Sequence, residues 1–202
     1  MVVRRMSSLA AMMAGLRPEE AARAARHFLT QGTSFYPPWI GEIYSSQDGC
    51  GMTEIMAKLR ERGVDVYLVS AGLEPIVEAA GEYLGVPTSH RRGSPMEVQE
   101  GVYTGEVESL YAAKQSVVRT LLGGPALLGF GDSAASDFEF MVDVAGPVFM
   151  INPTAEFLAK ENEHAGGRFV ALRYSDTENS LESGKAAPAP GGTGRESGAP
   201  GP

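Results

Sequence analysis

The chain alternates helical segments with short apolar strands, and this order constrains its fold more than any other feature. Apolar and β-branched runs predict strands over residues 64–70, 125–131, 146–151 and 168–172. Helical patterns separate them, over about 53–62, 73–85, 112–122, 136–142 and 154–164. Because parallel strands need long crossover connections, the alternation predicts an α/β domain with a parallel sheet.

Two further helices are predicted ahead of this region, over 6–15 and 18–30. Pro18 suits a first helical turn. Arg4 and Arg5 stand before a mildly apolar stretch, which is the outline of a poor secretory signal, but the helical continuation favours an amphipathic helix.

Residues 88–111 interrupt the alternation with short polar and apolar stretches, in which the Glu100-Gly101 pair predicts a hairpin turn. The His90-Arg91-Arg92 run is interpreted as a solvated loop, with a contact to an anionic group as the alternative.

Composition narrows the class of partner. A chain of 202 residues with 43% hydrophobic residues can bury the core of one domain. A formal net charge of −8 without a basic stripe argues against nucleic acid or an anionic membrane surface as the binding partner. No run reaches the ~20 apolar residues of a membrane span.

Cys50 is the only cysteine, which excludes an intramolecular disulfide. We therefore expect a soluble cytoplasmic protein with a small-molecule partner; the oligomeric state stays open.

The strongest chemical signal is the segment GFGDSAASDFEFM, residues 129–141. An apolar strand brings Asp132 to its carboxyl end, and Asp137 follows five residues later across a turn of small residues. Ligands bind at this edge of parallel α/β sheets, and two close carboxylates suit a hard cation such as Mg²⁺. Taken alone, an ordinary helix-capping turn explains the two residues equally well.

Two other positions point to the same edge. Ser70 ends the strand VYLVS, and the backbone amides of Ala71 and Gly72 can approach a phosphate where the next helix begins. Lys114 begins the helix before the Asp132 strand, within reach of the same crevice. Taken singly, Ser70 is better explained as a helix N-cap and Lys114 as a solvated surface lysine. Their order along the chain carries more information than either residue.

A strand ending in serine, then a lysine, then a strand followed by GDxxxxD resembles the second, third and fourth motifs of the haloacid dehalogenase-like superfamily. The likeness covers about residues 16–172, and the YLVSAGLEPIVE and INP segments are similar to the phosphoserine phosphatase branch. It implies a Rossmann-like three-layer α/β/α core over 51–175 and a remnant of a small helical cap over 1–50. Residues 176–202 are rich in Gly, Pro, Ser and Ala, and we expect a disordered tail there.

The resemblance also implies roles. Ser70 would hydrogen-bond the substrate phosphoryl group, and Lys114 would neutralise its charge and orient the nucleophile. Asp132 would bind Mg²⁺ directly, and Asp137 directly or through water. The implied activity is Mg²⁺-dependent hydrolysis of a small phosphorylated metabolite, whose anionic oxygens need such neutralisation. Ser136 stands where close relatives of phosphoserine phosphatase have asparagine, and the spacing is one residue longer, so phosphoserine itself is not specified as the substrate.

The nucleophile of that family has no counterpart here. The resemblance implies a DxDxT motif ahead of the cap, whose first aspartate attacks phosphorus, and this sequence contains no DxD. The nearest imitation runs from Asp48 to Thr53, but Cys50 takes the acid position and the segment is typical of a Gly-rich loop. The resemblance places the absent first strand between the Ser70 and Asp132 strands. We therefore expect a sheet without its central strand, in a truncated and inactive fragment.

Two other functions stay open. One is a non-catalytic remnant that still binds phosphate or a metabolite. The other is a GDS-type serine esterase, because FGDS (130–133) resembles that nucleophile block, with Ser133 attacking an acyl carbonyl and His164 as its base. That block belongs near the N-terminus of its fold, whereas here Ser70 and Lys114 precede it.

Overall fold

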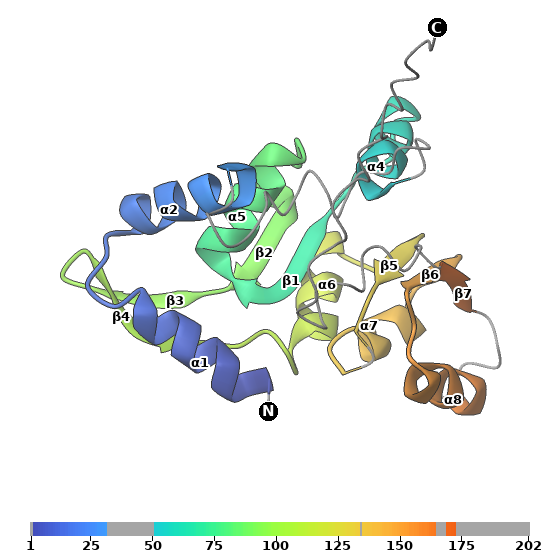
Figure 1. Ribbon diagram of the computed structural model, residues 1–202. Helices are drawn as coiled ribbons and strands as arrows, with labels where there is room; N and C mark the ends of the chain where they lie inside the picture. The colour runs from blue at the N-terminus through green and yellow to red at the C-terminus, as the bar shows by residue number, and fades with distance from the viewer. Residues whose placement is uncertain (1, 32–50, 134, 165–168, 173–202) are drawn as a thin grey trace, which may run out of the picture.

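The computed structural model describes residues 2–31, 51–133, 135–164 and 169–172. Residues 32–50 of the expected cap, Cys50 among them, and the expected tail lie outside these residues. The elements in chain order are α1 (Val2–Met12), α2 (Pro18–Gln31), α4 (Met52–Glu61), β1 (Leu68–Leu73), α5 (Glu74–Tyr83), the 3₁₀ turn η1 (Thr88–His90), β2 (Arg91–Ser94), β3 (Met96–Gln99), β4 (Val102–Val107), α6 (Lys114–Leu122), β5 (Gly129–Gly131), α7 (Phe138–Val142), β6 (Val148–Ile151), α8 (Ala155–His164) and β7 (Phe169–Leu172) (Figure 1). The predicted α/β class is confirmed.

The parallel strands form two separate sheets. β1 pairs in parallel with β2, while β5, β6 and β7 form a three-stranded parallel sheet. In the part of the chain that the structure describes, β1 pairs with no strand but β2, and β5 with none but β6. Helix α6 contacts β1 and α7, and it lies between the two sheets in Figure 1. The family resemblance places its first strand at this same break.

The predicted hairpin is present. β3 and β4 pair antiparallel, and the two turn residues Glu100 and Gly101 both have positive φ, 52° and 82°. Helix α1 packs on β4. There Gly105, with φ of 91°, leaves room for the helix, because a Cβ at this glycine would lie 3.2 Å from the Cα of Ala11.

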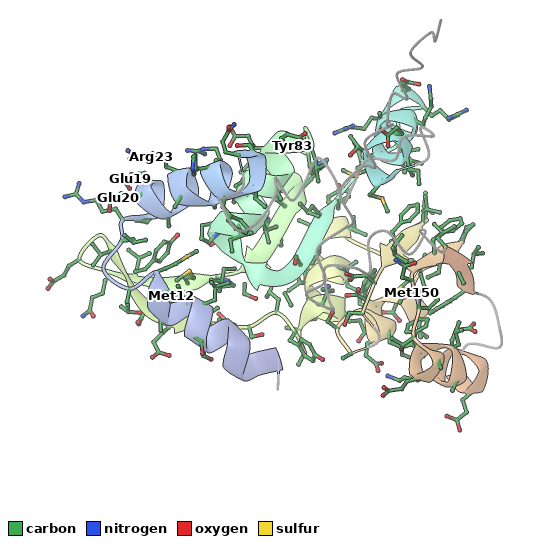
Figure 2. The ribbon with its side chains drawn as sticks, in the orientation of Figure 1. Met12, Glu19, Glu20, Arg23, Tyr83 and Met150 are labelled. Atoms are coloured by element: carbon green, nitrogen blue, oxygen red, sulfur yellow. The ribbon has the colours of Figure 1, made fainter. Side chains whose placement is uncertain are left out.

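The apolar core divides into three clusters. The first joins α2, α4 and α5; the second joins α1, α2 and the hairpin with the end of β1; the third lies on one side of the β5-β6-β7 sheet, against α7 and α8. Met150 of the third cluster is labelled in Figure 2. In the described residues no helix is long and apolar enough to cross a membrane.

The interpretation of His90-Arg91-Arg92 as a solvated loop was wrong, because His90 ends the turn η1 and Arg91 and Arg92 begin strand β2. The reason is the position of the Arg91 side chain, which is only 11% exposed. Its guanidinium donates hydrogen bonds to the carbonyl oxygens of Val86 (2.6 Å) and Glu78 (3.1 Å) and pairs with the Glu78 carboxylate at 3.0 Å. Arg91 is a charged residue at a partly buried position of the strand. The strand therefore lacks the alternation of apolar and polar residues by which a strand is predicted from sequence.

Gly93 in β2 gives the first testable prediction. A Cβ at this position would lie 2.5 Å from the Cα and 2.8 Å from the nitrogen of Glu74, the first residue of α5. The backbone of Glu74 or of β2 must shift to accommodate a methyl group at this position. Gly93→Ala is therefore expected to lower the free energy of unfolding, measured by urea titration, by about 1–3 kcal/mol. Gly124→Ala is the matched control, since its Cβ would meet no atom within 4 Å. Equal stability of the two variants would contradict the close approach of α5.

Candidate functional site

The carboxyl end of β5 holds both predicted acids. Asp132 directly follows the strand, and the next turn brings Asp137 back to it, with the Asp137 amide donating to the carbonyl oxygen of Ser133 at 2.9 Å. Gly131 makes room for this return, because a Cβ there would lie only 2.9 Å from Asp137 Oδ2. Strand and turn therefore place the two carboxyl groups side by side.

The Asp137 carboxylate is buried and accepts hydrogen bonds on both oxygens. Oδ1 accepts from Lys114 Nζ at 2.5 Å and from Ser136 Oγ at 2.9 Å. Oδ2 accepts from the backbone amides of Asp132 at 3.0 Å and Ser133 at 3.1 Å. A carboxylate has about four acceptor positions, so no position is left for direct contact with a cation.

Lys114 is not a solvated surface lysine. It is 7% exposed, it begins α6, and its ammonium group lies 5.8 Å from the centre of the Phe140 ring. Burying an unpaired ammonium is costly, so the ion pair with Asp137 is what permits this position. The alternative interpretation of Lys114 as exposed is therefore wrong, and the predicted approach to the acids is observed.

The two acids have opposite electrostatic environments. Asp132 is exposed at the surface, but partial desolvation of its carboxyl group, followed by repulsion from the Asp137 charge, raises the pKa of Asp132. Burial acts to raise the pKa of Asp137 too. The Lys114 ammonium and the amides of Ser133 and Asp132 outweigh that effect and lower the pKa of Asp137. The surroundings therefore favour the ionised form of Asp137 and disfavour that of Asp132.

Ser70 lies where β1 departs from regular pairing. Leu68 and Val69 pair with β2, pairing resumes only at Leu73, and residues 70–72 bulge between them. The Ser70 hydroxyl accepts a hydrogen bond from the Gly72 amide at 3.0 Å, so its own hydrogen stays available as a donor.

The positions of Ala71 and Gly72 differ from the prediction. They belong to β1, and α5 begins only at Glu74, so their amides do not start a helix as expected. The Gly72 amide is bound to Ser70, and the Ala71 carbonyl oxygen accepts from Ser94 Oγ at 2.8 Å. The bulge is therefore held by one side chain of its own, Ser70, and by Ser94 from strand β2.

Ser70 and the acids belong to different sheets. Among the described residues, no hydrogen bond joins Ser70 to Lys114 or Asp132. The connection runs through α6, which begins at Lys114 and contacts β1. The structure thus assembles Lys114, Asp132 and Asp137 directly and places Ser70 on the neighbouring sheet.

The contacts of two further serines were not predicted. Ser94 is fully buried, donates to Ala71 and accepts from the Leu110 amide at 3.0 Å, which ties β2 to the bulge and to the segment before Lys114. Ser136 binds Asp137, as described above. Serine in a Gly- or Ala-rich stretch is typical of a loop, so the sequence carried no signal for either contact.

For the esterase alternative, the structure describes the proposed nucleophile Ser133 but not the side chain of the proposed base. The Ser133 hydroxyl accepts from the Ser136 amide at 3.3 Å, and the side chain of His164 lies outside the described part of the chain.

The site suits a cation with few protein ligands. No group of three or more His, Cys, Asp or Glu side chains in the described residues could hold a metal ion. Mg²⁺ commonly binds through one or two carboxylates and completes its shell with water and substrate phosphate. Asp132, exposed at the carboxyl end of β5, has a carboxylate of the kind that such a cation binds.

The chain is similar to known proteins in sequence and in fold. A sequence profile described as haloacid dehalogenase-like hydrolase matches residues 2–142. Among solved structures, a protein of unknown function from Bordetella pertussis Tohama I is 17% identical with a TM-score of 0.60, covering 83% of this chain and 73% of its own. A phosphoserine phosphatase, solved as a phospho-aspartyl intermediate analogue, is 18% identical with a TM-score of 0.52, covering 90% of this chain and 77% of its own. These likenesses show a shared fold. No curated protein sequence matched.

Proposed function

The chain belongs to the haloacid dehalogenase-like hydrolase family, and from this premise we propose that it supplies the phosphate- and magnesium-binding half of a phosphatase site. The substrate class is a small phosphorylated metabolite. The observation that carries the proposal is the buried Lys114–Asp137 ion pair beside Asp132 at the carboxyl end of β5.

Lys114 and Ser70 would bind the phosphoryl group. An ammonium group has three hydrogens, and Asp137 takes one of them, which leaves donors for phosphoryl oxygens. The free hydroxyl hydrogen of Ser70 supplies a further donor from the β1 side. Donors held in place before the substrate arrives stabilise developing negative charge without reorganisation.

Asp132 would hold Mg²⁺, which when bound supplies positive charge to the transferring phosphoryl group. Asp137 acts through water or through Lys114, because its acceptor positions are occupied. Of the two roles that the resemblance implies for Asp137, this geometry favours the indirect one.

The sequence contains no DxD motif, so the aspartate that attacks phosphorus is not available on this chain. That observation favours a second candidate function for the 202-residue chain on its own, namely binding of phosphate or a phosphorylated metabolite without turnover. Both candidate functions use the same binding residues. They differ in the expected result when a strand that carries the nucleophile is added to the chain, since only the phosphatase candidate predicts hydrolysis.

Replacement of Asp132 tests the binding site that both candidates need. Asp132→Asn keeps the shape and removes the charge, so the Mg²⁺ dependence of inorganic phosphate binding is expected to disappear in calorimetric titrations. Asp65→Asn, an exposed acid at the amino side of β1, is the control and should bind as the natural chain does. Phosphate binding that is indifferent to both Mg²⁺ and Asp132→Asn would refute the cation assignment.

A further inference from the structure

The Asp137 carboxylate is oriented by two kinds of donor. The backbone amides that bind Oδ2 belong to the turn itself, so they fix one oxygen through the main chain. Among the described residues, Oδ1 is bound by side chains alone, those of Lys114 and Ser136. Rotation of the carboxylate about its last bond is therefore limited at Oδ1 by a long flexible ammonium side chain and a short hydroxyl.

We propose that Ser136 is a positioning residue, whose hydroxyl holds Asp137 Oδ1 so that the carboxylate keeps the Lys114 ammonium directed at the phosphate position. The inference rests on the proposed function for the role of Lys114. Ser136 itself touches no substrate atom and acts through Asp137.

The geometry of the turn gives Ser136 this role. Its hydroxyl reaches the adjacent Asp137 carboxylate at 2.9 Å. The amide of Ser136 makes a longer contact of 3.3 Å to Ser133 Oγ, and this contact does not involve the carboxylate. Ser136 is half-buried, so water competes less for its hydroxyl than at an exposed site. Loss of the hydroxyl leaves Oδ1 with Lys114 alone, and carboxylate and ammonium can then move together away from their present place.

Ser133 offers a matched comparison in the same turn. Its hydroxyl accepts from the Ser136 amide and makes no bond to the carboxylate, while its own amide, which binds Oδ2, survives substitution. A serine-to-alanine change at either position removes one hydroxyl from the turn. Only the change at Ser136 removes a donor from Asp137.

The experiment uses the 202-residue chain with two readouts, calorimetric binding of inorganic phosphate in Mg²⁺ and the NMR resonance of the Lys114 side-chain NH₃⁺ group. Ser136→Ala is expected to weaken phosphate binding about tenfold, the loss of one hydrogen bond to a charged group, and to shift or broaden the Lys114 resonance. Ser133→Ala should do neither. Ser136→Thr retains a hydroxyl and should restore both.

Several results would overturn the inference. Ser136→Ala indistinguishable from the natural chain would show that the hydroxyl is dispensable, and equal losses from Ser133→Ala and Ser136→Ala would show a general effect of the turn. If Ser136→Ala does not fold, Ser136→Cys takes its place as the test. Because the thiol is a weak donor, this variant is expected to show the same weakening of phosphate binding and the same change of the Lys114 resonance.

The design also separates this inference from the proposed function. If the natural chain binds no phosphate, the proposed function fails. The Lys114 resonance then still tests the positioning role: a shift in Ser136→Ala but not in Ser133→Ala supports it, and no shift in either refutes it.

Discussion

Purified residues 1–202 are expected to hydrolyse p-nitrophenyl phosphate no faster than background, with or without Mg²⁺. Under the proposed function Ser70, Lys114 and Asp132 bind and polarise a phosphate, but the sequence contains no DxD motif whose aspartate could accept the phosphoryl group. Electrostatic stabilisation without a nucleophile leaves unassisted water to attack, and the covalent route is closed. Release of p-nitrophenol, measured against a chelator-treated sample, checks the expectation.

A strand that ends in an aspartate pair is expected to change this result when it is fused so that it can pair between β1 and β5. Hydrolysis should rise by about 10⁶-fold or more over the uncatalysed rate. Stability should rise with it, because β1 and β5 each pair with one strand in the described residues, and the added strand would pair with both. The same strand with asparagines in place of both aspartates is the control, which should gain stability alone. Turnover by the unfused chain that depends on Ser70 and Asp132 would show that the nucleophile lies elsewhere.

Asp137→Ala is expected to cost about 3–5 kcal/mol of unfolding free energy. The change leaves the Lys114 ammonium buried without its partner and removes the acceptor for the amides of Asp132 and Ser133. Urea titration measures the loss. Glu61→Ala breaks the exposed Lys58–Glu61 pair, with side chains 66% and 62% exposed, and should cost less than about 1 kcal/mol. Comparable losses in the two variants would contradict a buried, structurally important pair.

The pH dependence distinguishes the two acids in Mg²⁺-free buffer. The folded pKa of Asp137 is lowered, so its stabilising contribution is present above the unfolded pKa and disappears as pH falls through the folded one. The folded pKa of Asp132 is raised, so its ionisation opposes folding at neutral pH, and that penalty disappears as pH falls. Asp132→Asn should therefore not destabilise the metal-free chain, unlike Asp137→Ala.

Much of the fold could be predicted, because helical periodicity and apolar runs are local. The hairpin turn, the helices and the Asp132 strand all follow from such patterns. β2 could not be predicted, since its pairing depends on Arg91 turning back to Glu78, a contact set by tertiary structure. The bulge at 70–72 likewise depends on Ser94, which lies on another strand.

The order of site residues could be predicted, but their environment could not. The positions of Lys114 and Asp132 near one edge follow from strand order. The burial of Lys114 does not, because a single lysine at a helix start is exposed in most proteins. The hydroxyl contact of Ser136 depends on a turn geometry that composition alone does not specify.

The three apolar clusters divide between two regions, which we expect to open separately. Two clusters lie within residues 10–107 and the third within 126–169, and α6 contributes to none of them in the described part of the chain. Regions joined by so little apolar contact exchange their amide hydrogens as distinct cooperative units. A phosphate held by Ser70 on one region and Lys114 and Asp132 at the other would connect them. Ligand binding should then make amide exchange in β2 and β6 slow down together, so that the two regions unfold as a single unit.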